Sequence, residues 1–296
     1  MRSWLPALVC LLLCPLAAQG WNADSHRLTG LIARRLLADD PALLASVDAV
    51  LAELRSDRHR GLVDATTWMD DTARRGVDDH WHYIDLAFDG VAPTFDASWS
   101  AQQDREQAPW ALDRARAAIT ARAADRPQAL ARLLHLVGDL HQPLHCAERS
   151  ADRGGNTIQV TNYQFQRDGQ QVTGNLHTCW DWAAGLVVRN NLIVYDRDLV
   201  PRQEGQPLSA LMAAAAPSRE AASQLDSRVW AQESYLAACT AVYGRSPVNQ
   251  GTSPVTLSSE YIDRARDLAQ TRLVLAGYRL AAQLRAMRTA LVGRDA

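Results

Sequence analysis

The feature that most constrains this chain is the segment 135–145, which carries three histidines and an aspartate on a stretch that otherwise has the character of a buried apolar helix. His135 and Asp139 are four residues apart, and His177 and Asp181 repeat this spacing. On an α-helix such a pair lies on one face, about 40° apart around the axis. Imidazole and carboxylate are ligands of zinc and its neighbours, and burying them without partners is costly. The sequence therefore predicts a metal site on a buried helix.

Residues 1–20 have the pattern of a secretory signal peptide, with Arg2 followed by an apolar stretch and then by small residues. Cleavage after Gly20 would make Trp21 the first residue of the mature chain, five positions before His26. An α-amino group has an ordinary pKa of about 8, and a metal ion readily displaces its proton. The nitrogen and carbonyl oxygen of Trp21 could then chelate one ion beside His26. We expect a secreted or periplasmic protein.

Length and composition limit the domain organisation, the binding partners and the disulfides expected for the mature chain. Its length predicts one sizeable core, so we expect a single domain over 21–296. The formal net charge of the full sequence is −2, and removal of Arg2 with the signal peptide makes it −3. This charge argues against strong binding to duplex phosphate backbones, but it does not exclude a nucleic-acid substrate if bound metal ions supply positive charge. An exported chain can form disulfides, and the pairings considered are Cys146 with Cys179 or Cys179 with Cys239.

Helical periodicity dominates the chain, so the predicted fold class is mainly α. Helices are expected over 24–38, 41–55, 62–75, 110–124, 127–142, 178–190, 218–242 and 257–289, with loops at 89–109 and 244–256. Residues 154–176 differ, because alternating polar and apolar residues between glycines predict a small hairpin. After the N-terminal segment, no stretch approaches the roughly 20 apolar residues that a membrane-spanning helix needs.

Seven sequence segments follow one another along the mature chain. They are Trp21-x4-His26, Trp68-x-Asp70, Trp81-His82-Tyr83-Ile84-Asp85, His135-x3-Asp139-x-His141-Gln142-Pro143-Leu144-His145, Asn175-Leu176-His177-x2-Trp180-Asp181, Trp230-Ala231-x-Glu233-Ser234 and Gly277-x-Arg279-Leu280-Ala281. In this order and spacing they resemble the secreted zinc-dependent single-strand nucleases and 3′-nucleotidases, which are the trinuclear zinc nucleases of fungi, plants and bacteria. Each segment alone is weakly specific, but their order and spacing together are specific, and the resemblance extends through nearly the whole mature chain.

The resemblance implies a single-domain helical fold of the zinc-dependent phospholipase C and nuclease type, with a small β-hairpin excursion, and three Zn²⁺ ions. In that family the first ion is held by residues that match Asp70, His82, His135 and Asp139. The second is held by those matching His145, His177 and Asp181, and the third by Trp21, His26 and the shared Asp139. The implied catalytic residues are Asp70 and Asp139, and Asp85 with Tyr83 match the nucleobase contacts. His141 is left over, and we expect it to hydrogen-bond to a ligand.

The implied activity is hydrolysis of single-stranded DNA, RNA and 3′-nucleotides to products with 5′-phosphates. Zinc lowers the pKa of bound water towards neutrality, which provides a nucleophile for in-line attack on phosphorus. A preference for single strands follows if an unpaired base must stack in the site. We expect a monomer without stable membrane association.

The identity of the first aspartate ligand stays open between two neighbours. The family usually has an arginine three residues after this ligand; that position is Ala73 counted from Asp70 and Arg74 counted from Asp71. The Trp-x-Asp spacing favours Asp70.

Two other functions are the alternatives. A bacterial zinc-dependent phospholipase C shares the helical three-zinc plan, but the short gap from Trp21 to His26, the 32-residue gap from His145 to His177 and an aspartate at position 181 argue against it. A non-enzymatic zinc-binding protein would need closed coordination, whereas this ligand set leaves positions open.

Overall fold

The structure is a computed structural model and describes residues 20–72, 78–89, 106–167, 170–186, 194–195 and 206–293. The expected signal peptide lies outside the described residues except for Gly20. The fold is mainly α with short two-stranded sheets, as the sequence predicts. Among the described residues, no helix is long and apolar enough to cross a membrane.

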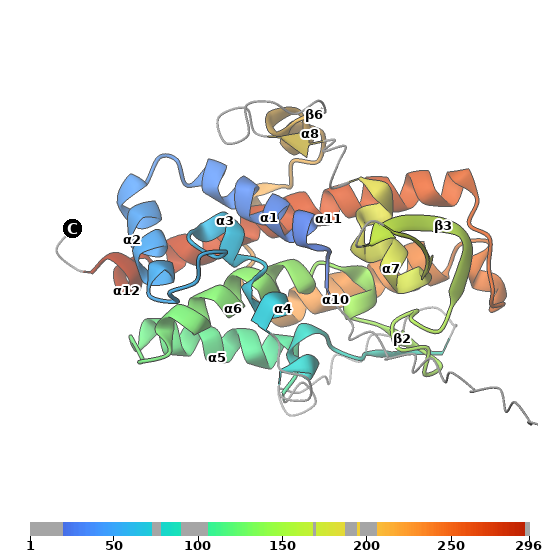
Figure 1. The fold of residues 1–296 in the computed structure, drawn as a ribbon, viewed down its shortest axis with the longest axis horizontal. Helices are drawn as coiled ribbons and strands as arrows, with labels where there is room; N and C mark the ends of the chain where they lie inside the picture. The colour runs from blue at the N-terminus through green and yellow to red at the C-terminus, as the bar shows by residue number, and fades with distance from the viewer. Residues whose placement is uncertain are drawn as a thin grey trace, which may run out of the picture.

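The longest helix, α11 (Ser259–Ala286), runs along the long axis of the molecule, and α1 (Ala23–Leu36) packs against it (Figure 1). The two helices approach closely at Gly277, where a β-carbon would lie 2.5 Å from Cβ of Ile32. Real side chains are not tolerated at that distance, so a larger residue would force the helices apart. The glycine therefore fixes the position of α1 and of His26, which α1 carries.

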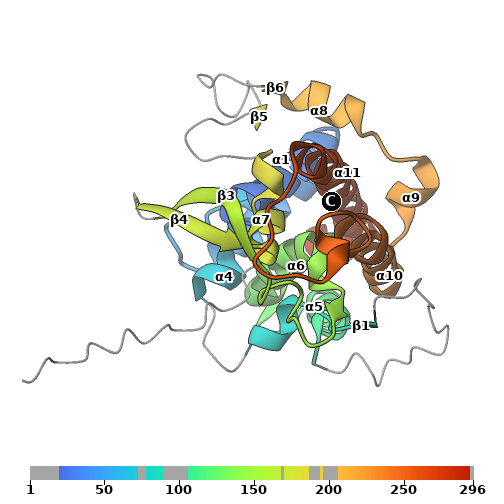
Figure 2. The same ribbon diagram turned by 90° about the vertical axis from the view of Figure 1, so that its right-hand side faces the viewer.

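Helix α6 (Arg126–Asp139) lies at the centre and carries the first part of the histidine-rich segment. Figure 2, a view turned by 90°, shows α5 (Ala108–Thr120), α6 and α10 (Ser227–Ala237) grouped beside α11. Pro127 suits the first turn of α6, because its fixed φ is helical and its missing N–H has no partner there. All residues of α6 from 133 onward are buried, which places His135 and Asp139 inside the protein.

Helices from the N-terminal and C-terminal parts of the chain pack against this group of helices. Helix α2 (Pro41–Ala52) packs against α6, and α12 (Arg288–Val292) packs against α2 and α5. The side chain of Asp40 caps α2 by accepting a hydrogen bond from the Leu43 backbone N–H at 3.1 Å.

The excursion predicted at 154–176 is confirmed as an antiparallel hairpin of β3 (Gln159–Arg167) and β4 (Gln170–Asn175). Strand β4 leads directly into α7 (Leu176–Asp181), which carries the second His–Asp pair. Two short parallel pairs complete the strands: β1 (Ala87–Phe88) with β2 (Glu148–Arg149), and β5 (Val194–Tyr195) with β6 (Gln206–Pro207).

The helix expected over 62–75 is divided into α3 (Leu62–Ala65) and α4 (Trp68–Thr72). Thr66 and Thr67 separate them, and each hydroxyl donates to a backbone carbonyl three residues earlier. Such local bonds compete with the helical pattern. Residues 73–77 lie outside the described residues.

Two other predicted helices also differ. The segment 218–242 is divided into α9 (Arg219–Ser223) and α10, which continues as the π-helical turn Ala238–Tyr243. A separate helix, α10, begins after Asp226, because the Asp226 side chain caps it by accepting a hydrogen bond from the Arg228 backbone N–H. Helix α7 ends at residue 181, and of the extension expected to 190, residues 187–190 lie outside the described part of the chain.

One described helix was not predicted, and the predicted loops agree in part. The unpredicted helix is α8 (Leu208–Ala214). The loop at 244–256 is present, with one 3-10 turn at Val248–Gln250. Most of the loop predicted at 89–109 lies outside the described residues.

Neither of the two disulfide pairings that the sequence left open is present in the structure. Cys146, Cys179 and Cys239 are buried free thiols. The Cys146 thiol faces the carbonyl of Leu140 at 3.8 Å, and burial raises its pKa to about 12. A buried thiol with a raised pKa is unreactive and packs as a small apolar side chain.

Candidate metal centre

The predicted ligand side chains come together where α1, α6 and α7 meet α4 and two 3-10 turns, η1 (Asp79–His82) and η2 (Pro143–His145). Three groups of them have ligand atoms within 4.8 Å of one another. All are buried except Asp70, whose side chain is 14% exposed. The grouped residues are His26, Asp70, His82, His135, Asp139, His145, His177 and Asp181.

The first group surrounds the Oδ2 atom of Asp139. Nδ1 of His82 and Nε2 of His135 each lie 3.0 Å from that oxygen and 3.0 Å from each other. Oδ1 of Asp70 lies 3.5 Å from His135 Nε2 and 3.7 Å from His82 Nδ1. Nitrogen ligands of one tetrahedral zinc ion lie about 3.3 Å apart. His82, His135 and Asp139 therefore have the spacing that a single ion needs. Asp70 belongs to another, overlapping group with His135 and His26, whose ligand atoms also lie within 4.8 Å of one another.

The second group joins the end of η2 to α7. Oδ1 of Asp181 lies 3.5 Å from Nε2 of His177 and 3.9 Å from Nε2 of His145. The two imidazole rings stack with their centres 5.1 Å apart. The side chain of Gln142 donates to the same Asp181 oxygen at 2.8 Å, which orients the carboxylate towards the histidines.

The third predicted position lies between these groups. Nε2 of His26 is 3.3 Å from Oδ1 of Asp139, the oxygen that the first group does not use. Trp21 is fully buried, and its indole N–H donates to the carbonyl of Gly138 at 3.0 Å. The backbone just before it reaches the same aspartate, because a β-carbon on Gly20 would lie 1.8 Å from Asp139 Oδ1.

Three histidines present the same ring nitrogen to the cluster. Nδ1 of His135 donates to the carbonyl of Thr66, Nδ1 of His145 to that of His82, and Nδ1 of His177 to that of Gly154, each at 2.7 Å. A carbonyl can only accept, so the proton is on Nδ1 and Nε2 is the atom that faces the other ligands. Histidine ligands of metals are oriented by backbone carbonyls in this way.

Burial and charge shift the pKa values of the cluster. Burial alone would lower the pKa of His135, but the charges of Asp139 and Asp70 outweigh it and raise the pKa to about 9. Burial would raise the pKa of Asp139, yet the charge of His135 and hydrogen bonds from neighbouring histidines hold it well below its usual value. Burial lowers the pKa of His145 to about 3, so its ring is neutral at pH 7.

The donor set fits metal ions because several atoms have no other partner. Among the described residues, both ring nitrogens of His26, Nε2 of His145 and Oδ1 of Asp139 are buried without a hydrogen bond. Leaving a buried polar group unsatisfied costs about 1–3 kcal/mol. Imidazole and carboxylate donors without a thiolate suit zinc and its neighbours. A bound cation would therefore stabilise this arrangement.

Comparison with known proteins agrees with the site. The model of the S1/P1 nuclease family matches residues 21–288. The chain belongs to this family. Endonuclease 1 from Arabidopsis thaliana is 28% identical over 92% of this chain and 88% of its own length, and Endonuclease 5 from the same plant is 26% identical over 96% of each chain. Nuclease S1 from Aspergillus oryzae is 31% identical over 53% of each chain.

The two neighbouring aspartates of this S1/P1 nuclease point to different places. Asp70 faces His82 and His135 in the first group. Oδ2 of Asp71 lies 2.8 Å from Nε2 of His59, whose Nδ1 lies 2.7 Å from the Ser56 hydroxyl. His59 was not singled out in the sequence, because a histidine without a ligand-like spacing carries no signal there.

The predicted substrate contacts lie at the edge of the cluster. Asp85 follows η1 by three residues and is exposed, and Tyr83 is half-buried. Partial desolvation and the nearby charge of Glu148 raise the pKa of Asp85 to about 6. The Tyr83 hydroxyl lies 3.0 Å from Nδ1 of His80. The Asp85 carboxylate and the Tyr83 side chain therefore offer hydrogen-bonding groups and an aromatic ring close together in the chain.

His141 does not contact a ligand of the cluster, contrary to expectation. It lies on the far side of the turn after α6, where Nε2 accepts a hydrogen bond from Arg279 and the ring packs on Trp230. Arg272 also donates to the His141 carbonyl, at 3.2 Å, and Glu233 pairs with both arginines. Glu233 and Arg279 each stand in a segment that carries the family resemblance. The sequence did not indicate that the two side chains pair with each other.

Proposed function

We propose that this S1/P1 nuclease is a zinc-dependent phosphodiesterase that hydrolyses single-stranded DNA and RNA, and also 3′-nucleotides, to products with 5′-phosphates. The observation that carries the proposal is the shared carboxylate. Asp139 places one oxygen in the group of His82 and His135 and the other beside His26. Asp139 would therefore help to hold two metal ions, which would supply Lewis acidity and positive charge for phosphate hydrolysis.

In this proposal Asp70, His82, His135 and Asp139 would hold the first ion, His145, His177 and Asp181 the second, and Trp21, His26 and Asp139 the third. When bound, the ions supply Lewis acidity, an activated water and charge to stabilise phosphoryl oxygens. All other contributions come from side chains of the chain itself.

Asp70 is the group placed to orient the attacking water. Its side chain is 14% exposed, more than that of any other residue grouped in the cluster, so solvent can reach it. A carboxylate at this place can orient a water by accepting a hydrogen bond from it. Asp139 is fully buried and holds the geometry.

Asp85 and Tyr83 are proposed to bind the nucleobase. The carboxylate of Asp85 accepts from base N–H groups when ionised, which its pKa of about 6 permits at neutral pH. The Tyr83 ring offers a face for stacking, which requires an unpaired base and so favours single strands.

The protein is also proposed to be exported, with cleavage after Gly20, and to act as a monomer without stable membrane association. Export would free the amino group of Trp21, whose neighbour Gly20 lies against the shared aspartate. The curated relatives are named endonucleases, which supports cleavage within a strand.

The test is hydrolysis of single-stranded DNA by protein with a verified Trp21 N-terminus, before chelation, after chelation and after zinc is added back. Zinc-restored cleavage that leaves 5′-phosphates is the expected result, and duplex DNA of the same sequence is the matched substrate control. A fully zinc-loaded sample that cleaves neither DNA nor RNA but releases phospholipid headgroups would instead establish the phospholipase alternative.

A further inference from the structure

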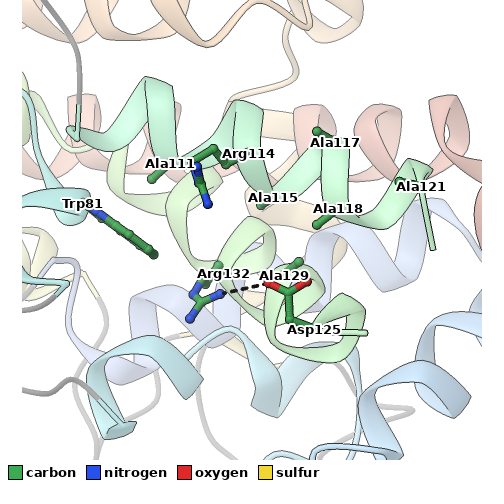
Figure 3. A pocket seen from close by; sticks show the side chains of 10 residues that line it. All are labelled: Trp81, Ala111, Arg114, Ala115, Ala117, Ala118, Ala121, Asp125, Ala129 and Arg132. Carbon is green, nitrogen blue, oxygen red and sulfur yellow. Dashed lines mark ion pairs between the residues drawn. The ribbon is translucent and has the colours of Figure 1, made fainter. Parts of the chain in front are cut away.

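A groove between α5 and α6 takes no part in the chemistry described above. Its volume is about 390 Å³, and small alanine side chains of both helices form its floor. Figure 3 shows Arg114 of α5 and Arg132 of α6 directed into it, with Trp81 at one end and Asp125 beside Arg132. The groove is therefore an open hollow with cationic and aromatic walls.

The groove shares its elements with the metal centre. Trp81 directly precedes His82 in η1, and Arg132 lies one helical turn before His135 in α6. A ligand in the groove would therefore contact the same two elements that carry His82 and His135. Because they share η1 and α6, the groove and the metal centre have a fixed position relative to each other.

The side chains of the groove have the chemistry that single-stranded nucleic acid requires. The guanidinium of Arg132 lies 5.2 Å from the ring centre of Trp81, and that of Arg114 lies 4.8 Å from that of Trp110. The two tryptophans meet edge to face at 5.9 Å. Guanidinium groups held on aromatic rings are fixed in place and keep N–H groups available for phosphate, while indole rings stack on bases.

Charge also favours a polyanion. Among the residues that line the groove, Arg114 and Arg132 are the cations and Asp125 is the one carboxylate. Asp125 is 61% exposed and lies 4.0 Å from Arg132, at the limit of an ion pair. Such a weak pair leaves Arg132 able to take a phosphate as partner.

We propose that this groove binds the part of a single-stranded nucleic acid that flanks the cleaved bond, with phosphates on Arg114 and Arg132 and a base against Trp81. The inference rests on the proposed nuclease function, because it assigns a place to the remainder of a long substrate. A 3′-mononucleotide has no such flanking part. The groove should therefore set the preference for long substrates over short ones.

The test compares Arg114→Gln and Ala117→Glu, two changes at exposed positions of the groove, with Arg264→Gln at the exposed start of α11. Arg264→Gln removes the same charge outside the groove. We expect the ratio of kcat/KM for a 20-nucleotide single strand to that for a 3′-mononucleotide to fall about fivefold in both groove variants. The control should keep the wild-type ratio. Equal ratios in all four proteins would overturn the proposal.

A binding measurement separates this inference from the nuclease proposal itself. Fluorescence anisotropy with a labelled 20-nucleotide strand, in chelator and across a salt series, needs no cleavage. Loss of one phosphate contact in Arg114→Gln should reduce the slope of log K against log salt by about 0.7. The groove proposal then holds even if no DNA is hydrolysed. Absence of binding by the wild type, or a slope unchanged in Arg114→Gln, would overturn it.

Discussion

Arg279 donates a hydrogen bond to Nε2 of His141 across 3.0 Å, and both side chains are fully buried. Nδ1 of His141 donates to the carbonyl of Val137, so Nε2 is the acceptor. Burial and two neighbouring guanidinium groups hold the pKa of this ring well below its usual value. The neutral histidine therefore anchors the turn that joins Asp139 to His145.

Replacing Glu233 with glutamine should weaken this anchor. Its carboxylate accepts from Arg279 at 2.6 and 2.8 Å and from Arg272 at 3.1 Å, so the change leaves two buried guanidinium groups without their counter-ion. We expect the free energy of unfolding in urea to fall by about 3 kcal/mol. Zinc affinity should fall about tenfold, because the network holds the turn that joins the ligands Asp139 and His145.

The matched control for this change is Arg60→Gln, which breaks an exposed pair with Asp57. Because both groups are exposed to solvent, the change should leave the free energy of unfolding and the zinc affinity close to the wild-type values. If Glu233→Gln lowers stability but not zinc affinity, the network supports the fold without positioning the ligands.

Asp70→Asn and Asp71→Asn should separate two neighbouring carboxylates by function. Asp70 lies within 3.7 Å of His82 and His135, so its loss should reduce kcat by about 100-fold or more and lower the zinc content. Asp71 faces His59 and is 42% exposed, so its loss should cost about 1 kcal/mol of stability or less and little activity. Zinc content by atomic emission and kcat on single-stranded DNA are the measurements. The reverse pattern would make Asp71 the ligand.

The fold was predictable where the pattern was local. The apolar period of α6, the alternation of β3 and β4 and the His–Asp spacing each reflect one element, and the structure agrees with them. The division of the helix at Thr66 was missed, because hydroxyl bonds to backbone carbonyls compete with helix in a way that apolar periodicity does not record.

Prediction of the site from the sequence was also limited to local patterns. The histidine spacing and the family motifs predicted which side chains would come together, but not what lies behind them. The partners of His141 come from α11, well over a hundred residues away in the chain, and Asp71 is held by a histidine in a loop. Long-range contacts of this kind depend on how whole helices pack, which a single sequence does not specify.

In protein stripped of metal, the pH dependence should follow His135. Its pKa is raised from 6.5 to about 9, so its charged form stabilises the folded state. That stability is fully present below about pH 6.5 and is lost as the pH rises through about 9, so the Tm of the stripped protein should fall over this window. Zinc must displace the proton, so binding at pH 7 should release about one proton, measured by calorimetry in buffers of different ionisation enthalpy. His135→Gln should remove both effects.

An N-terminal extension should interfere with the centre directly. A β-carbon on Gly20 would lie 1.8 Å from Oδ1 of Asp139 and 3.2 Å from Cε1 of His145, so residue 20 occupies the space between two groups of ligands. In protein that begins at Trp21, this space is open to the free amino group and an ion. Native mass spectrometry should therefore show one more zinc in that protein than in protein extended by residues 18–20, and kcat on single-stranded DNA should be at least about 100-fold higher. The same three residues added after Ala296 serve as the control and should change neither value. Equal zinc content and equal kcat in the N-terminally extended protein would show that the Trp21 amine is not a ligand.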